Sequence, residues 1–258
     1  MVAAEPPSII GLIPARAGSK RVRNKNIRRL GDHPVIAYTI AVARTSGVFG
    51  AVLVSTDSPL IADIAKHYGA EVPFLRPAEY ATDTSPDIEW IEYTLGRLRD
   101  EGRRYECFSI LRPTSPFRTP ATIQRAWREF RAETGVDSLR AVEKCKQHPG
   151  KMWIIRGRRM LPLLSMGPAE QPWHSSQYQS LFEVYAQNAS LEIAWSRVVF
   201  EGRTIAGHVL MPFFTEGFEG FDINDVRDWR YAEELLRAGD ATLPHVAEPP
   251  VAGEIPGG

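Results

Sequence analysis

The chain has 258 residues, with 31 Lys and Arg against 31 Asp and Glu, and 43% of its residues are hydrophobic. These values are typical of an ordinary globular protein and exclude a collagen-like, disordered or disulfide-scaffold chain. The formal charge of zero argues against a general nucleic-acid binder, which needs a basic surface.

The N-terminal part alternates between apolar runs and helical patterns. Residues 9–13 and 51–55 are typical of buried parallel strands. Helices are expected over 35–45, after Pro34, and from Asp57, as N-cap, to about Tyr68. Further helices are expected at 86–100, 120–133 and 226–238, and further strands at 107–111, 138–142, 190–195 and 209–214. This order predicts an α/β fold with a parallel, doubly wound sheet.

Residues 143–187 break this alternation and contain several prolines and aromatic residues. A structureless stretch of that length is unusual inside a compact domain, so we expect a protruding module that pairs subunits. A floppy surface insertion is the alternative. The α/β domain then comprises 8–142 and 188–240, and the Pro- and Gly-rich residues 241–258 are expected to be a disordered tail.

Other features indicate the cellular setting. No apolar run approaches the ~20 residues that cross a bilayer, and the first residues lack the pattern of a signal peptide. The two cysteines, Cys107 and Cys145, show no metal-binding or redox spacing. We therefore expect a cytoplasmic protein without membrane or nucleic-acid partners.

Residues 14–29, which follow the first strand, carry Lys and Arg but no acid. Ligands of open α/β sheets bind beyond the carboxyl ends of the strands, and small residues at 17–19 let the backbone approach a phosphate. The GxxxxGK[ST] and GxGxxG patterns are absent, which disfavours a P-loop hydrolase and a dinucleotide dehydrogenase. The loop therefore predicts a site for a small anionic ligand, with a solvated basic loop as the alternative.

Four motifs in order make the chain recognisable: LIPARAGSKRVRNKNIRRLGDHPVIAYTI, VSTDSPLIADIAKHYGAEVPFLRPAEYATDTSPD, LRPTSPFRT and FDINDVRDWRYAE. Over about residues 8–238 the chain resembles the acylneuraminate cytidylyltransferase family, the synthetases of CMP-activated sialic and related nonulosonic acids. The resemblance implies a Rossmann-like mixed, mostly parallel sheet flanked by helices, with a protruding dimerisation module. It also implies a homodimer that uses CTP, a nonulosonic acid and Mg²⁺, and releases pyrophosphate.

The resemblance also assigns candidate site residues. By this resemblance, the nucleotide is expected to bind Arg16, Ser19, Lys25, Asn26, Arg76, Ser85 and Asp87. The acceptor is expected to bind Arg112, Asn188 and Lys151, and the metal is expected to bind Asp222 and Asn224. Arg16, Lys25 and Asp222 are the expected catalytic residues, since Arg16 and Lys25 can neutralise the departing pyrophosphate.

Structural alternatives accompany several of these assignments. Helix capping is the alternative for Ser85 and Asp87, and a loop-bracing role is the alternative for Arg112, which stands where many relatives have Gln. Asn224 replaces the second aspartate of an Asp-x-Asp arrangement. Residues two apart on an extended segment point the same way, so both side chains can approach one Mg²⁺.

Other functions stay open at this point. The acceptor can be a different acid, such as a phosphonate. A metal-dependent glycosyltransferase also carries an Asp-x-Asp segment, and a non-catalytic nucleotide-binding protein would tolerate the departures at Arg112 and Asn224. Pyrophosphate release from CTP separates the synthetase from both.

Overall fold

A six-stranded sheet forms the centre of the protein, whose structure, a computed structural model, describes residues 8–251. The strand order is β10-β6-β9-β5-β1-β4. The strands are β1 (Ile9–Pro14), β4 (Ala51–Ser55), β5 (Cys107–Ile110), β6 (Ser138–Lys144), β9 (Tyr185–Trp195) and β10 (Leu210–Phe214). A separate short hairpin joins β2 (Arg29–Leu30) to β3 (His33–Pro34).

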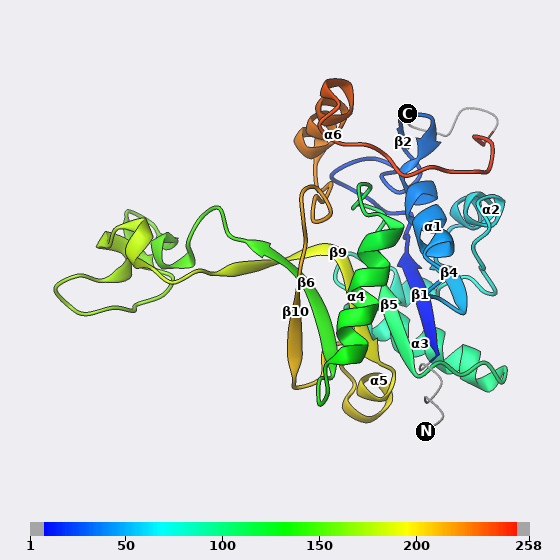
Figure 1. The fold of residues 1–258 in the computed structure, drawn as a ribbon, viewed down its shortest axis with the longest axis horizontal. Coiled ribbons are helices and arrows are strands. Elements are labelled where there is room, and N and C mark those ends of the chain that lie inside the picture. The colour runs from blue at the N-terminus through cyan, green and yellow to red at the C-terminus, as the bar shows by residue number, and fades with distance from the viewer. Residues whose placement is uncertain (1–7, 252–258) are drawn as a thin grey trace. The chain divides into compact units, whose positions relative to one another are not determined.

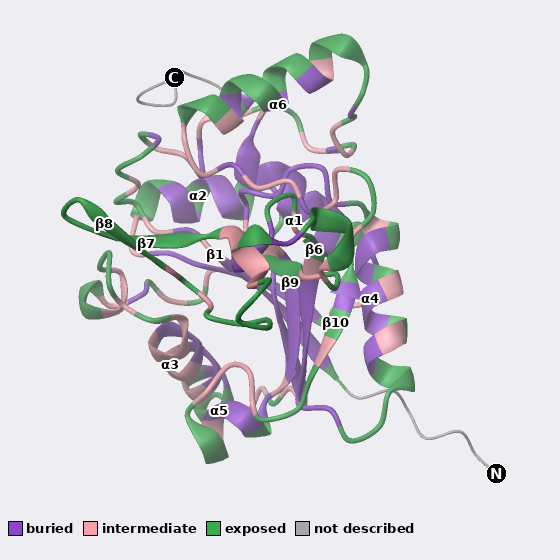
Figure 2. Ribbon diagram, turned by 90° about the vertical axis from the view of Figure 1, so that its left-hand side faces the viewer, coloured by how far each residue is buried: buried purple, intermediate pink, exposed green. Residues whose placement is uncertain are grey.

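The register of the sheet confirms the expected mixed, mostly parallel arrangement. β1 pairs in parallel with both β4 and β5, and β5 pairs antiparallel with β9. β1, β4 and β5 are continuous apolar runs because both faces of the sheet are covered. These strands are buried in Figure 2.

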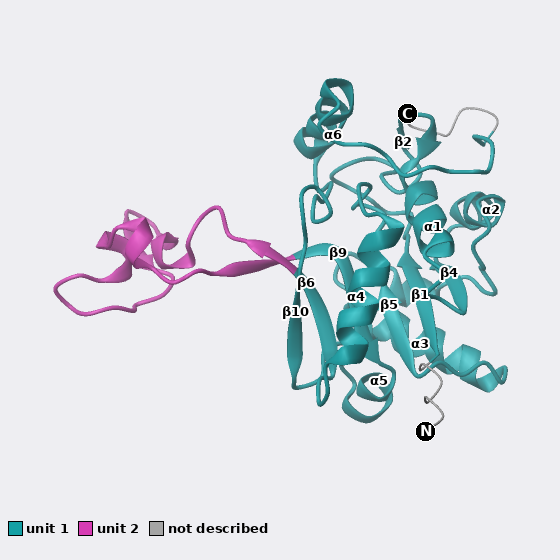
Figure 3. Cartoon of the chain, in the orientation of Figure 1, with its two compact units in different colours: residues 1–141, 188–258 teal, residues 142–187 magenta. Residues whose placement is uncertain are grey.

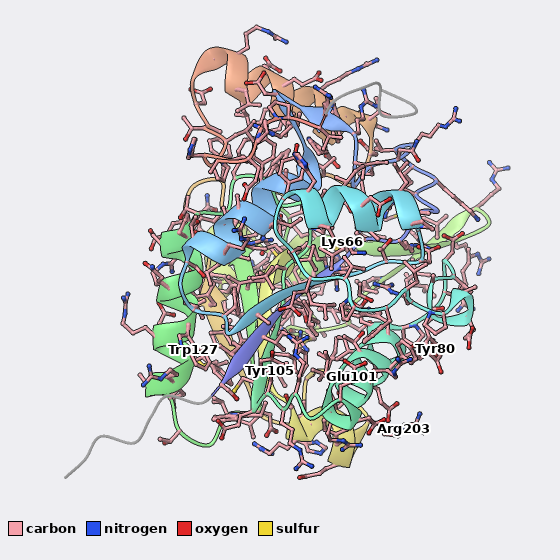
Figure 4. The ribbon with its side chains drawn as sticks, turned by 90° about the vertical axis from the view of Figure 1, so that its right-hand side faces the viewer. Lys66, Tyr80, Glu101, Tyr105, Trp127 and Arg203 are labelled. Atoms are coloured by element: carbon pink, nitrogen blue, oxygen red, sulfur yellow. The ribbon has the colours of Figure 1, made fainter. Side chains whose placement is uncertain are left out.

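Two helical layers cover the sheet (Figure 1). On one face pack α1 (Val35–Thr45), α2 (Pro59–His67), α4 (Pro120–Ala132) and α6 (Val226–Ala238). On the other face pack α3 (Asp87–Asp100) and α5 (Arg197–Gly202), of which α5 was not predicted. Trp127 and Tyr80, both labelled in Figure 4, belong to opposite faces. Trp90, Trp127 and Trp229 are buried.

Helix N-termini follow from their capping residues. The Asp225 carboxylate accepts from the backbone N–H groups of Arg227 and Asp228 and begins α6. The expectation for Asp57 is wrong, because Ser58 directly precedes the first-turn Pro59 and its Oγ accepts from Ile61 N at 3.4 Å. Asp57 is thereby left for another contact, described below.

The chain divides into two compact units, residues 1–141 with 188–258, and residues 142–187 (Figure 3). The second unit contains the hairpin of β7 (Trp153–Arg156) and β8 (Arg159–Pro162), which is exposed in Figure 2. His148 is buried inside this unit, where its Nδ1 accepts from Gly150 N at 3.0 Å. Aromatic residues around His148 therefore give the unit a small core of its own.

Residues 241–251 differ from the expected disordered tail. Ala241 and Val246 are buried in the core, and the Glu248 carboxylate pairs with Arg44. The backbone of Val251 accepts from Arg29 at 2.7 Å and donates to the Tyr68 hydroxyl at 3.3 Å. The Pro- and Gly-rich composition therefore marks an extended segment that packs against the domain, while 252–258 lie outside the described residues. Within 8–251, no helix combines the length and apolar character needed to cross a bilayer.

Candidate functional site

A cavity of about 410 Å³ opens beside the carboxyl ends of β1 and β5. Ten of its lining residues come from the sequence-based assignment: Arg16, Ser19, Lys25, Asn26, Arg76, Ser85, Asp87, Arg112, Asp222 and Asn224. The other lining residues are Pro14, Arg21, Tyr80, Thr82, Asp83, Trp90, Pro113, Thr114 and Ala189. Five basic and three acidic side chains line the cavity, so it favours an anionic ligand.

The basic loop after β1 is held open by backbone contacts. Ala15 N donates to Ser55 O, and Ala17 N donates to Asp57 Oδ1, both at 2.9 Å. Asp57 therefore braces this loop instead of capping α2. A Cβ added at Gly18 would meet no atom within 4 Å, so the space beside this part of the loop is open.

Asp83 supplies counter-charge to this loop. Its carboxylate contacts Arg16 at 2.7 Å and also pairs with Lys20. Hydrogen bonds from Lys20 and Arg16 lower the pKa of Asp83. A bound polyanion must therefore compete with Asp83 for the Arg16 guanidinium.

A second group of contacts surrounds Arg76, which is buried. Its guanidinium donates to the Ser55 hydroxyl at 3.0 Å and the Ser55 carbonyl at 2.8 Å, and lies 4.7 Å from the centre of the Trp90 ring. Burial lowers the pKa of Arg76 to about 10, against the opposing charges of Asp57 and Asp87. The Arg76 guanidinium is therefore occupied by contacts within the protein, and Arg76 forms part of the cavity wall.

Asp87 begins α3 and ties this wall to Arg112. Its Oδ1 accepts from Trp90 Nε1 at 2.8 Å, and its Oδ2 accepts from Arg112 at 2.5 Å. Burial opposes ionisation of Asp87, but the charge and hydrogen bond of Arg112 leave its pKa lowered. Neither Ser85 nor Asp87 caps α3 through its side chain, because the N-cap residue is Pro86.

Asp222 lies on the segment before α6 and fits a divalent cation. Its Oδ2 accepts from Asn224 Nδ2 at 2.7 Å, and its Oδ1 is buried without a hydrogen-bond partner in the described part of the chain. An oxygen left in this way is the donor that Mg²⁺ prefers, and Mg²⁺ commonly uses one or two carboxylates together with substrate phosphates. Residues 8–251 contain no cluster of three His, Cys, Asp or Glu that could hold a metal by itself. The chain therefore offers Mg²⁺ one carboxylate, beside the place where a phosphate can enter.

Two cations flank Asp222. Lys25 donates to Ile223 O at 3.0 Å, and burial lowers its pKa although Asp222 opposes the shift. Arg118 is fully buried, and burial lowers its pKa to about 9, again against the charge of Asp222. Nε and Nη1 of Arg118 have no hydrogen-bond partner among the described residues, so Asp222 is the main source of compensating charge.

Two predicted acceptor residues, Asn188 and Lys151, are absent from the lining of the cavity. Asn188 donates from Nδ2 to Thr215 Oγ1 at 2.9 Å, and its Oδ1 accepts from Ser190 N at 3.1 Å; its neighbour Ala189 lines the cavity instead. Lys151 belongs to the second unit, where its Nζ donates to Ser176 O at 2.6 Å. Both side chains are therefore satisfied locally.

Sequence reasoning missed several wall residues. Tyr80, Thr82, Asp83 and Thr114 line the cavity, although none of them is among the assigned site residues. Glu192, which contacts Arg112 at 3.3 Å, was not considered at all. The sequence signal for Glu192 was an acidic residue between the apolar residues of a predicted buried strand, 190–195.

Comparisons with known proteins show the family of the chain. The cytidylyltransferase family matches residues 10–147. The chain is 34% identical over 238 residues to the CMP-N,N'-diacetyllegionaminic acid synthase of Legionella pneumophila subsp. pneumophila (strain Philadelphia 1), covering 91% of this chain and 99% of that protein.

The chain is also 33% identical over 224 residues to the N-acylneuraminate cytidylyltransferase of Escherichia coli O18:K1:H7, covering 87% of this chain and 51% of that protein. Among solved structures, a CMP:2-keto-3-deoxy-manno-octonic acid synthetase complexed with CTP shares the fold. Its TM-score is 0.65 at 11% identity, with 90% of this chain and 99% of that chain covered.

Proposed function

We propose, from the premise that the chain belongs to the cytidylyltransferase family with the CMP-nonulosonic acid synthetases, that it transfers CMP from CTP to a nonulosonic acid. The observation that carries the proposal is that ten of the twelve candidate residues line the same cavity, together with an excess of basic side chains. In the reaction, the anomeric hydroxyl oxygen bonds to the α-phosphorus of CTP, and its proton is released to water. The bond from that phosphorus to the β-phosphate bridging oxygen breaks, and pyrophosphate leaves.

The chain's own residues bind and orient the triphosphate. Arg16, Ser19 and Lys25 border the open loop after β1, and we assign them to the phosphates. The charges of Arg16 and Lys25 offset the negative charge that gathers on the departing pyrophosphate, which is the main demand of phosphoryl-type transfer. Asn26, Ser85 and Asp87 are assigned to the nucleoside. The Asp87 carboxylate is an acceptor suited to the cytosine amino group.

Mg²⁺ is part of the proposal, with Asp222 as its protein ligand and Asn224 beside it. When bound, Mg²⁺ neutralises phosphate charge and acts as a Lewis acid. The hydrogen bond from Asn224 Nδ2 fixes Asp222 Oδ2 and leaves Oδ1 for the cation. Asn224 therefore serves as an orienting residue in this proposal, at least through its amide nitrogen.

The acceptor is proposed to lie toward Arg112 and Ala189. In the strand order β9-β5-β1-β4, these residues belong to the β5 and β9 side, and the basic loop belongs to the β1 side. Asn188, which also belongs to β9, and Lys151 complete the predicted acceptor set. Their present contacts must open or be supplemented for direct binding.

We also propose a cytoplasmic homodimer that pairs through the second unit. Its hairpin exposes Ile154, Ile155, Met160 and Leu161, each more than two-fifths exposed. The register pairs Ile154 with Leu161 on one face of the hairpin and Ile155 with Met160 on the other, so both faces expose apolar side chains. Exposed apolar surface of this kind marks an interaction site, and a second copy of the chain is the occupant we propose. Replacing Ile155 and Leu161 together by Asp should give a monomer in light scattering after size-exclusion chromatography. A variant pair that remains dimeric contradicts this interface.

The test of the reaction is a pyrophosphate-release assay with CTP, Mg²⁺ and a panel of acids: sialic, legionaminic and pseudaminic acids, and small phosphonates. Release with a nonulosonic acid is the expected result. Release with a phosphonate alone changes the acceptor class. No release with any acid, together with a thermal shift by CTP, supports a non-catalytic nucleotide-binding protein.

A further inference from the structure

An ionised layer lies where the strand pattern calls for an apolar core. Glu192 of β9 and Arg140 of β6 are buried, with side chains 6% and 8% exposed, and their charged groups pair directly. Both belong to alternating strand positions whose neighbours, Leu191 and Leu139, face the opposite hydrophobic cluster. Taking two charges out of water costs several kcal/mol per ion, so a purely structural core would favour apolar residues here.

The outer end of this layer is Arg112. Glu192 lies opposite Ile110, the last residue of β5, in the antiparallel register, and Arg112 follows two residues later in the chain. The end of β5 therefore brings Arg112 close to Glu192 of the neighbouring strand. Glu192 accepts from Arg112 Nη2 at 3.3 Å through Oε1, while its Oε2 faces Arg140.

Asp87 holds the same nitrogen from the other side. Its Oδ2 accepts from Arg112 Nη2 at 2.5 Å, so one nitrogen of the guanidinium is shared between two carboxylates. The Arg112 side chain nevertheless remains 31% exposed and lines the cavity. Two carboxylates on Nη2 restrict the orientation of the guanidinium, and the N–H groups of Nη1 and Nε remain for single charge-assisted hydrogen bonds to an anion.

We propose that Glu192 is a specificity-determining positioning residue, which with Asp87 fixes Arg112 to recognise the carboxylate of the acid acceptor. This inference rests on the proposed function. Arg140 is the inner ion-pair partner of Glu192 in the sheet. Arg112 contacts the acceptor, and Glu192 acts through it.

The decisive probe is the acceptor carboxylate itself. A nonulosonic acid and its C1 carboxamide are compared in the pyrophosphate-release assay with CTP and Mg²⁺. The wild-type chain should prefer the acid, because an arginine that has been placed for a carboxylate loses a charge-assisted contact with the amide. Glu192→Gln keeps the volume of the side chain and removes its charge. We expect it to lower the acid-to-amide ratio of kcat/KM about tenfold, which corresponds to 1.4 kcal/mol, with KM for CTP within about twofold of wild type.

Two further variants separate positioning from loss of stability. Arg112→Gln should lower the ratio at least as far, and the Arg112→Gln/Glu192→Gln pair should be no worse than Arg112→Gln alone. Asp137→Asn is the matched control, because Asp137 is also a buried acid paired with an arginine, Arg197, at 2.6 Å. It should lower thermal stability and keep the wild-type ratio.

The outcomes are distinguishable. An active wild-type chain whose acid-to-amide ratio survives Glu192→Gln overturns the inference and leaves the proposed function intact. Equal rises of KM for CTP and for the acid in Glu192→Gln also overturn it, because they indicate a general structural role. A wild-type chain that releases pyrophosphate with no acid overturns the proposed function, and the inference falls with it.

Discussion

Replacing Asp222 by Asn tests the centre of the site. The change keeps the shape of the side chain and a hydrogen-bond acceptor for Asn224, but it removes the charge opposite Arg118. Removing one partner of a buried charge pair typically costs about 3–5 kcal/mol. Because Asp222 borders an open cavity and no direct ion pair to Arg118 is made, we expect about 2–3 kcal/mol. For a chain of this size that is a fall in Tm of about 5–10 °C.

The effect on turnover should exceed the effect on stability. Below the Tm, the folded fraction hardly changes, but the contact proposed between Asp222 and Mg²⁺ is weakened in the transition state. We expect turnover to fall at least ~100-fold. Pyrophosphate release at saturating CTP measures turnover, and thermal unfolding by circular dichroism measures stability. Direct binding of Mn²⁺ measures metal affinity.

A second variant tests the charge coupling between Asp222 and Arg118. In Asp222→Asn/Arg118→Met the buried cation is removed with its counter-charge, so the Tm should recover in part while turnover stays low. Near-normal turnover of purified Asp222→Asn removes Asp222 from the mechanism. Additive stability losses in the double variant refute the claimed coupling between Asp222 and Arg118.

Three further outcomes are expected. Asp83→Asn releases Arg16 for the triphosphate and should tighten CTP binding about two- to fivefold in low-salt calorimetry, less so in high salt, and weaker binding would contradict this competition. Backbone N–H bonds, first from His208, lower the pKa of Asp137 to about 2 from an ordinary 3.8. Asp137 should therefore contribute about 1–2 kcal/mol of stability above pH 4 that is lost as the pH falls toward 2, and Asp137→Asn should flatten this part of an acid-unfolding curve. Deleting residues 241–258 should lower the Tm by several degrees, because Ala241 and Val246 leave the core, and an unchanged Tm would show that the segment adds no stability.

Apolar runs predicted the sheet well because a strand covered on both faces must be apolar throughout. Residues 51–55 form β4, as expected, and the run at 107–111 gives β5 at Cys107–Ile110. Helix ends were predicted well where Pro and a capping residue coincide, as at Pro120. The early part of β9 was missed, because residues 185–189 are mostly polar or small and carry no strand pattern.

The sequence motifs predict most of the candidate residues that line the cavity, but they do not predict which groups these side chains contact. Asp57 precedes a helix, so local reasoning assigns it a cap, yet its partner is the backbone of Ala17, 40 residues earlier. Glu192 lies 80 residues from Arg112 and 52 from Arg140, and only the pairing of β5 with β9 and the order of the sheet bring the three together. Such contacts depend on topology, which no local pattern contains.

These partners change how the basic cavity should be understood. Arg16 pairs with Asp83, Arg112 pairs with Asp87 and Glu192, and Lys25 lies in the field of Asp222. A triphosphate therefore exchanges one set of ionic contacts for another, so its affinity is a difference between the two sets and is smaller than the number of cations implies. The same exchange favours specificity, because an anion that cannot displace Asp83 from Arg16 leaves the loop in its resting pairing.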